Sequence, residues 1–292
     1  MLLIIKSIPL SFAVLVRMII PTIGILFLVT LTVLVLGPLT LGLAAVVAVP
    51  VMAVLIALYG IRAALELLGD RSPTDHKSLL LSACIFAVIL AIAKAVTASA
   101  TGALAIIFAD WSMGDLVSAS TYQDANRETQ AAFELNLLGA FAAVTLFLSA
   151  ATSALLAIPM ANAARAAGRG SHGGSFFSGF GGSFVPLLLV YLVAQALQYV
   201  FGVFQIFFAF IPFLLALSGP SVFAELAEMD VTYILWGVGA ASALLWLYAW
   251  TWAACALALE KSEKAARTSR SVLAHVAQTP EIDIRALRKS RG

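Results

Sequence analysis

Charge is the property that this 292-residue chain lacks most. Only 11% of its residues are Asp, Glu, Lys or Arg, whereas 62% are hydrophobic. A soluble domain carries about a quarter charged residues to keep its surface solvated, so the composition excludes that class. The net charge of +2 is also too small to favour nucleic acid as a partner.

Cysteine and histidine are scarce as well. The two cysteines, Cys84 and Cys255, fall in the cytoplasmic halves of predicted helices. Thiols stay reduced on that side, so we expect no structural disulfide. The three histidines lie in separate segments, without the spacing of a zinc site. No Ser/His, Asp/Asp or Cys/His set is placed to act at one membrane depth. We therefore expect no metal, no cofactor and no enzymatic activity.

Long apolar runs take the place of the missing charge. A run of about 20 apolar residues spans the hydrocarbon core of a bilayer as a helix. The sequence predicts an all-α integral membrane protein, a polytopic bundle of about six transmembrane helices. The predicted spans are residues 12–36, 39–59, 79–108, 131–160, 184–210 and 233–259. They make up a transmembrane domain of residues 1–259, and a basic cytoplasmic tail of residues 260–292 follows. The stretch before Pro21 is either part of the first span or an interfacial helix.

The few basic residues are sorted to one side of this topology. All but two of the 17 Lys and Arg residues lie near the N-terminus, in the connections after the second and fourth spans, or in the tail. Basic residues near span ends are retained in the cytoplasm. We therefore predict a protein of a bacterial inner (plasma) membrane, with both termini in the cytoplasm and acidic connections on the outer face.

Two segments on the basic side resemble each other. Residues 64–72 follow the second span and residues 163–171 follow the fourth, and both contain helix formers, then a Gly, then a Ser. Each pattern predicts a helix that ends at a capping glycine, Gly69 or Gly168. The similarity indicates either three helical hairpins derived from one unit or a chance likeness between Ala-rich helix ends.

Lys94 is the most unusual residue within a span, because it lies near the middle of residues 79–108. A charge at that depth costs roughly 2.5–3.5 kcal/mol on insertion scales. Thr97 and Thr101 share its helical face. No other predicted span places an acid at mid-depth. Three roles stay open: binding an anionic substrate, lipid or ion; pairing with carbonyls, amides or a partner subunit; and snorkelling or losing the proton in a dry interior.

The fifth predicted span carries one polar face. Its polar residues recur three or four positions apart, or at multiples of that spacing, which is typical of a single helical face. Amide side chains avoid lipid because their donors and acceptors would go unpaired there. They either form interhelical hydrogen bonds or line a polar path shared with Lys94. The candidate residues of this polar face are Tyr191, Gln195, Gln198 and Gln205.

Two further surfaces are candidates for contacts. Trp246 and Trp250 share one face of the last span, where they are placed to contact another subunit. The tail contains a predicted short helix that begins at Thr279-Pro280, and its basic residues either dock on an anionic membrane surface or stay solvated. These basic residues are Arg285, Arg288, Lys289 and Arg291.

Two functions fit these sequence patterns. The first is a non-catalytic multi-pass subunit, scaffold or assembly factor of a membrane complex, which contacts the lipid bilayer and other membrane protein subunits or copies of itself. The alternative is a small transporter or channel, with a polar path lined by Lys94 and the Gln195/Gln198/Gln205 face. The lack of acids at mid-depth in the predicted spans argues against a proton- or sodium-coupled pump. The sequence favours the subunit.

Overall fold

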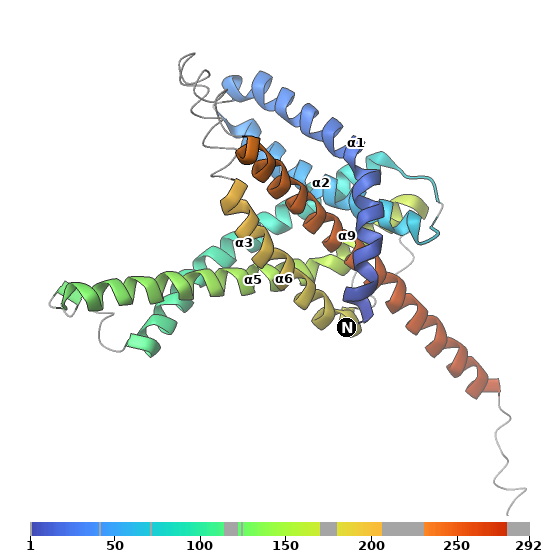
Figure 1. Cartoon of the computed structure of the whole chain (residues 1–292). Helices are drawn as coiled ribbons and strands as arrows, with labels where there is room; N and C mark the ends of the chain where they lie inside the picture. Colours follow the sequence, from blue (N-terminus) through green and yellow to red (C-terminus); the bar gives the residue numbers. More distant parts are fainter. Residues whose placement is uncertain are drawn as a thin grey trace, which may run out of the picture.

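The described part of the chain is all-helical. The computed structural model describes residues 2–40, 42–70, 72–113, 122–123, 125–169, 180–205 and 231–278. These residues form six long helices and no strand (Figure 1). The helices are α1 (Leu2–Leu39), α2 (Leu43–Leu67), α3 (His76–Met113), α5 (Arg127–Arg169), α6 (Phe180–Gln205) and α9 (Val231–Gln278).

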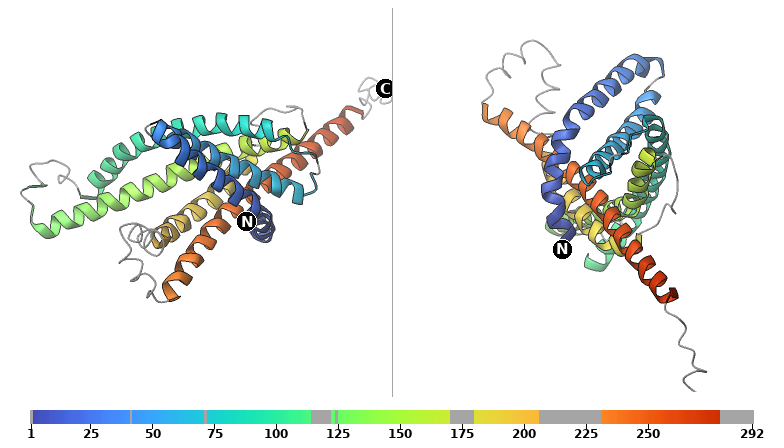
Figure 2. Two further views of the ribbon diagram at one scale, coloured as in Figure 1. Left: turned by 90° about the horizontal axis from the view of Figure 1, so that it is seen from above. Right: turned by 90° about the vertical axis from the view of Figure 1, so that its right-hand side faces the viewer.

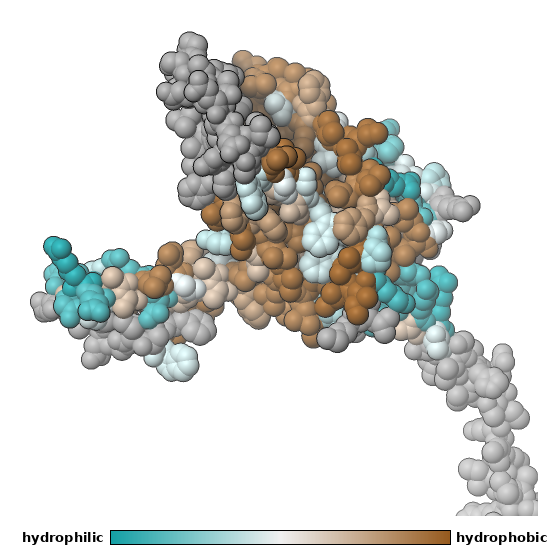
Figure 3. All heavy atoms as spheres, viewed as in Figure 1, coloured by the Kyte–Doolittle hydropathy of each residue, from teal (hydrophilic) through white to brown (hydrophobic). Residues whose placement is uncertain are grey.

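Each helix contains a stretch that is long and apolar enough to cross a membrane. The prediction of an all-α bundle with six such helices is therefore confirmed. The stretches are Leu3–Leu36, Ala45–Leu67, His76–Ile107, Arg127–Ala167, Ser183–Phe204 and Leu235–Ala265. Figure 3 shows the hydropathy of one face of the molecule, where an apolar surface lies between polar groups at opposite ends of the bundle.

The first and last helices extend beyond the predicted spans. The residues before Pro21 belong to the same helix as the rest of α1. Figure 1 shows that α1 bends along its course. Pro21 lies nearest its middle, and a proline there removes one backbone hydrogen bond and clashes with the preceding turn. At the other end of the chain, α9 continues to Gln278, well past the predicted end of the last span at residue 259.

Consecutive helices pack in pairs, and α9 is the central helix. α1 packs on α2, α3 on α5, and α6 on α9, while α9 also contacts α1, α2 and α5. In the most apolar window of α9, 61% of the residues are buried, compared with 0% in the corresponding window of α1. Among the described helices, α9 therefore packs extensively against all the others except α3.

The hydrophobic core lies at one end of the bundle, which we call the closed half. Small side chains dominate it: Ala154, Ala157, Ala161 and Ala164 recur along one face of α5 and are all fully buried. Small residues let helix backbones approach closely when there is no water to drive association. The core comprises residues within 3–18, 54–65, 79–87, 154–167, 187–194 and 247–259.

At the opposite end, which we call the open half, the helices spread apart (Figure 2). Among the described residues there, few are buried, and Ala105 and Val144 are examples. Large apolar side chains on α1 and α3, such as Phe27 and Ile107, are exposed instead. The open half therefore presents apolar helix faces that the described part of the chain does not cover.

The two predicted glycine caps have different outcomes. Gly69 has a φ of +104°, and the amides of Gly69 and Asp70 donate to the carbonyls of Glu66 and Leu65. This is the hydrogen-bond pattern of a Schellman motif, so the cap of α2 is confirmed. The prediction for Gly168 is wrong, because α5 continues through this residue to Arg169. Helix formers on both sides of Gly168 outweigh the modest cost of one internal glycine.

Candidate functional site

A buried arginine organises the closed half. Arg62, near the end of α2, has a side chain that is only 2% exposed. Its Nη2 donates to the backbone carbonyls of Asp70 and Ser72, and to the Ser72 hydroxyl at 3.1 Å. Its Nε donates to the Thr74 hydroxyl at 3.3 Å. One guanidinium group thus holds Asp70, Ser72 and Thr74 of the connection to α3 against the end of α2.

Ion pairs extend from Arg62 to three other helices. Arg62 lies 3.4 Å from Glu66 and 3.5 Å from Asp70. Glu66 also pairs with Arg17 of α1. Asp70 lies 3.5 Å from Arg165 of α5, which pairs in turn with Glu263 of α9. We call this set the ion cluster: Arg17, Arg62, Glu66, Asp70, Arg165 and Glu263.

The charges of the ion cluster balance, with three basic and three acidic members. Asp70 Oδ2 is shared between Arg62 Nη1 and Arg165 Nε, and these three buried atoms meet at ion-pair distance rather than in hydrogen bonds. Removing charges from water is costly unless each one has a partner. The alternation of sign from α1 to α9 meets this requirement, and it ties four helices together.

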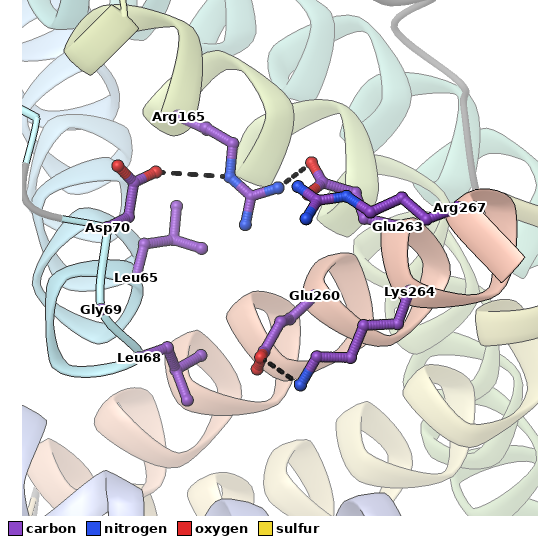
Figure 4. A pocket seen from close by; sticks show the side chains of 9 residues that line it. All are labelled: Leu65, Leu68, Gly69, Asp70, Arg165, Glu260, Glu263, Lys264 and Arg267. Carbon is purple, nitrogen blue, oxygen red and sulfur yellow. Dashed lines mark hydrogen bonds and ion pairs between the residues drawn. The ribbon is translucent and has the colours of Figure 1, made fainter.

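A cavity of about 250 Å³ lies beside the ion cluster (Figure 4). Arg165 points between Asp70 and Glu263, and on α9 Lys264 turns toward Glu260. The Lys264–Glu260 pair measures 2.6 Å and the Arg267–Glu263 pair 3.7 Å. Every basic group on the wall therefore has an acidic neighbour. The lining residues are Leu65, Leu68, Gly69, Asp70, Arg165, Glu260, Glu263, Lys264 and Arg267.

Metal ligation is not a role that the described residues support. No group of three or more His, Cys, Asp or Glu side chains comes together within the described ranges in a way that could hold a metal ion. The acids of the ion cluster already face guanidinium groups. Cys84 is exposed and Cys255 is buried, and both are free thiols.

Lys94 is exposed on α3, within the apolar stretch His76–Ile107. Its neighbours Ile92 and Val96 are exposed as well, at 61% and 64%. Among the described residues it forms no ion pair. Thr97 is half-buried, whereas Thr101 is buried and donates its hydroxyl hydrogen to the Thr97 carbonyl at 2.8 Å. The face predicted to contain all three residues is thus split between the exterior and the packed side of α3.

The polar face of α6 forms interhelical contacts. Gln195 donates from Nε2 to Ser153 Oγ of α5 at 3.1 Å, and the Tyr191 hydroxyl lies 3.2 Å from Cys255 Sγ of α9. Gln198 is half-buried, and Gln205 is the last residue of α6. α5 packs against both α3 and α6, which make no extensive contact with each other in the described ranges. The structure therefore does not place Lys94 on a helix that packs against Gln195 or Gln198. The side chain of Gln205 lies outside the described residues.

The tryptophan face of α9 is occupied by α1 of the same chain. Trp246 Nε1 donates to Ser11 Oγ at 3.0 Å, and Trp250 Nε1 donates to Ser7 Oγ at 2.8 Å. Both serines are fully buried. The expectation that these indoles face another subunit is therefore not met, because small serines on α1 give them partners nearby.

The predicted docking residues of the tail, Arg285, Arg288, Lys289 and Arg291, lie outside the described residues. The ion cluster was not predicted from the distribution of basic residues. The signal was available, because Arg62, Glu66 and Asp70 recur at intervals of four, from the end of α2 into the connection that follows it. Counting Lys and Arg to orient the helices ignores the acids that sit among them.

We compared the chain with models of protein families, with curated protein sequences and with solved structures, and found no match in any of the three.

Proposed function

We propose that this chain is a non-catalytic, membrane-embedded subunit of a larger membrane complex, and that a helix of another subunit covers Lys94. The observation that carries the proposal is the exposure of Lys94 within an apolar stretch of α3. A lone cation in that position is costly in lipid, and a neighbouring carboxylate or amide lowers the cost.

The lack of acids at mid-depth in the predicted spans favours a partner of different sequence. None of the predicted spans of this chain carries an acid at mid-depth, so a second copy would offer Lys94 no carboxylate. A symmetric pairing through the same face of α3 would instead bring two lysines together, which is unfavourable. A partner helix with an acidic residue at the same depth fits both the charge and the apolar surroundings.

We also propose the location and orientation of the protein. It would lie in a bacterial inner membrane with both termini in the cytoplasm, because the basic residues gather on one side of the six helices. The pairwise packing of consecutive helices supports an arrangement as three helical hairpins. The helical Gly168 weakens the case that these hairpins arose from one unit.

The test is purification of the full chain from its native host in mild detergent, followed by native mass spectrometry. We expect a partner in fixed stoichiometry. Lys94→Met should reduce recovery of this partner at least tenfold, while Lys94→Arg keeps it. Lys77→Met is the matched control, since Lys77 is an exposed lysine near the start of the same helix.

Two results would overturn the proposal. One is a chain recovered only as a monomer or homo-oligomer under conditions that preserve known membrane complexes. The other is solute flux through the purified chain in proteoliposomes that Lys94→Met abolishes while the chain stays folded. That second result would establish the transporter instead.

A further inference from the structure

A second cavity, of about 320 Å³, lies where the first turns of α1 meet α9. Leu3 and Leu257 form its apolar wall, and three lysines stand around it. Leu3 is buried and Leu257 is half-buried, whereas the lysines are exposed. The full lining is Leu3, Lys6, Leu257, Glu260, Lys261 and Lys264.

The charges on this cavity do not cancel. Lys264 pairs with Glu260 at 2.6 Å. Lys6 and Lys261 form no ion pair with any residue that the structure describes. The cavity beside the ion cluster shares Glu260 and Lys264 but has an acidic partner for every base. An excess of positive charge therefore distinguishes the cavity between α1 and α9, and it favours an anionic ligand.

The position of the cavity indicates what kind of anion it takes. Leu3 and Lys6 stand at the start of the apolar stretch Leu3–Leu36, and Lys261 and Lys264 stand near the end of the stretch Leu235–Ala265. The ends of membrane-spanning stretches lie at the level of lipid headgroups. Lysine side chains at that level reach toward phosphate while their stems cover apolar surface.

We propose that this cavity binds the headgroup of an anionic phospholipid, with the phosphodiester between Lys6 and Lys261 and the upper part of the acyl chains against Leu3 and Leu257. A soluble phosphate would use the lysines but would gain nothing from the two leucines. A diacyl lipid uses both parts of the lining, so the geometry favours the lipid.

The experiment uses the full chain in detergent micelles, titrated with phosphatidylglycerol or with phosphatidylcholine of the same acyl chains. Native mass spectrometry counts the bound lipids. We expect phosphatidylglycerol to bind more tightly. Each lysine near anionic lipid contributes roughly a fivefold gain in affinity. Lys6→Gln and Lys261→Gln should therefore each weaken binding about fivefold, and the double variant about 25-fold.

Matched variants separate the site from general surface charge. Lys77→Gln removes an exposed lysine on the same side of the bundle but away from the cavity, so it should leave binding unchanged. The double variant Lys6→Arg/Lys261→Arg keeps both charges and should retain binding. Because Lys6 and Lys261 are exposed, all these variants should unfold at the temperature of the wild-type chain.

Three outcomes would overturn the inference. The first is equal affinity for phosphatidylglycerol and phosphatidylcholine. The second is a Lys6→Gln/Lys261→Gln variant that binds phosphatidylglycerol as well as Lys77→Gln does. The third is displacement of the lipid by glycerophosphate at similar concentration, which would assign the site to a soluble phosphate. None of these outcomes bears on the partner at Lys94, because the cavity is lined by other helices.

Discussion

Burial of the Arg62 side chain removes its charge from water, and nearby oxygen atoms compensate for this loss. The side chain is almost fully buried, so water cannot solvate its charge, yet it lies within reach of two carboxylates and several oxygen atoms of the next connection. The planar guanidinium donates to several acceptors at once, and a lysine ammonium would do this less well. The buried charge of Arg62 is therefore stabilised only within the ion cluster, and the acids of the cluster in turn depend on Arg62.

We expect Arg62→Ala to lower the free energy of unfolding by about 3 kcal/mol or more, because it leaves Glu66 and Asp70 short of a positive partner in a poorly solvated site. Arg62→Lys should recover only part of this loss. Thermal unfolding in detergent, followed by tryptophan fluorescence, measures the effect. Lys77→Ala, at an exposed position, is the control and should change little.

A double-variant cycle makes this expectation sharper. Asp70→Asn also breaks the cluster, so the double variant Arg62→Ala/Asp70→Asn should be destabilised by less than the sum of the single effects. Strict additivity, or an Arg62→Ala protein as stable as the Lys77→Ala control, would show that the cluster does not hold the helices together.

The contact between α2 and α9 is close because a glycine stands opposite a tryptophan. A Cβ atom added at Gly60 would lie 2.2 Å from Cε3 of Trp252, and the indole is largely buried, with 8% exposure. The three atoms nearest to this Cβ all belong to the indole ring rather than to the flexible end of a side chain. α1 approaches α9 by a comparable device, since Ser7 and Ser11 leave space for the indoles of Trp246 and Trp250.

Gly60→Ala is expected to destabilise the fold by about 1–3 kcal/mol, since it overpacks a tight contact. Gly102→Ala provides the comparison, because nothing lies within 4 Å of a Cβ at that position of α3. There the change should be neutral or slightly stabilising, as alanine favours helix over glycine. Unfolding curves of the two variants, recorded in the same detergent, give the difference. A Gly60→Ala protein that is as stable as Gly102→Ala would refute the close contact.

The bundle as a unit is closed at one end and open at the other. The closed half contains the core, the ion cluster and the cavity between α1 and α9, whereas Lys94 lies near the middle of α3, beyond its core residues 79–87. Packing within the chain explains the closed half. The exposed apolar faces of the open half are stabilised when lipid or a partner helix covers them, since lipid tails solvate apolar side chains about as well as protein does.

Six membrane crossings require that both ends of the chain lie on the same side. We expect reporter fusions at Met1 and Gly292 to give the same cytoplasmic signal, and a fusion within residues 122–126 to give the opposite one. Labelling of single cysteines introduced at the same positions in intact cells provides an independent measurement. Termini on opposite faces of the membrane would contradict the proposed orientation. They would also contradict the placement of the cavity between α1 and α9 at the level of the lipid headgroups.

Local patterns in the chain predicted the six apolar helices and the glycine cap at Gly69, although the same pattern wrongly placed a cap at Gly168. The free energy of transferring apolar side chains into lipid is nearly additive along a segment, so hydropathy alone locates the helices. The Schellman cap involves only residues 64–70, so it depends on local sequence. The rotation of each helix about its axis was not predictable in this way. A bilayer solvates apolar faces much as neighbouring helices do, so hydropathy does not select which face turns inward. Packing in three dimensions placed Trp246 and Trp250 against Ser7 and Ser11, joined Arg165 to Glu263, and left Lys94 outside, because these outcomes depend on which side-chain shapes and charges meet across distant segments.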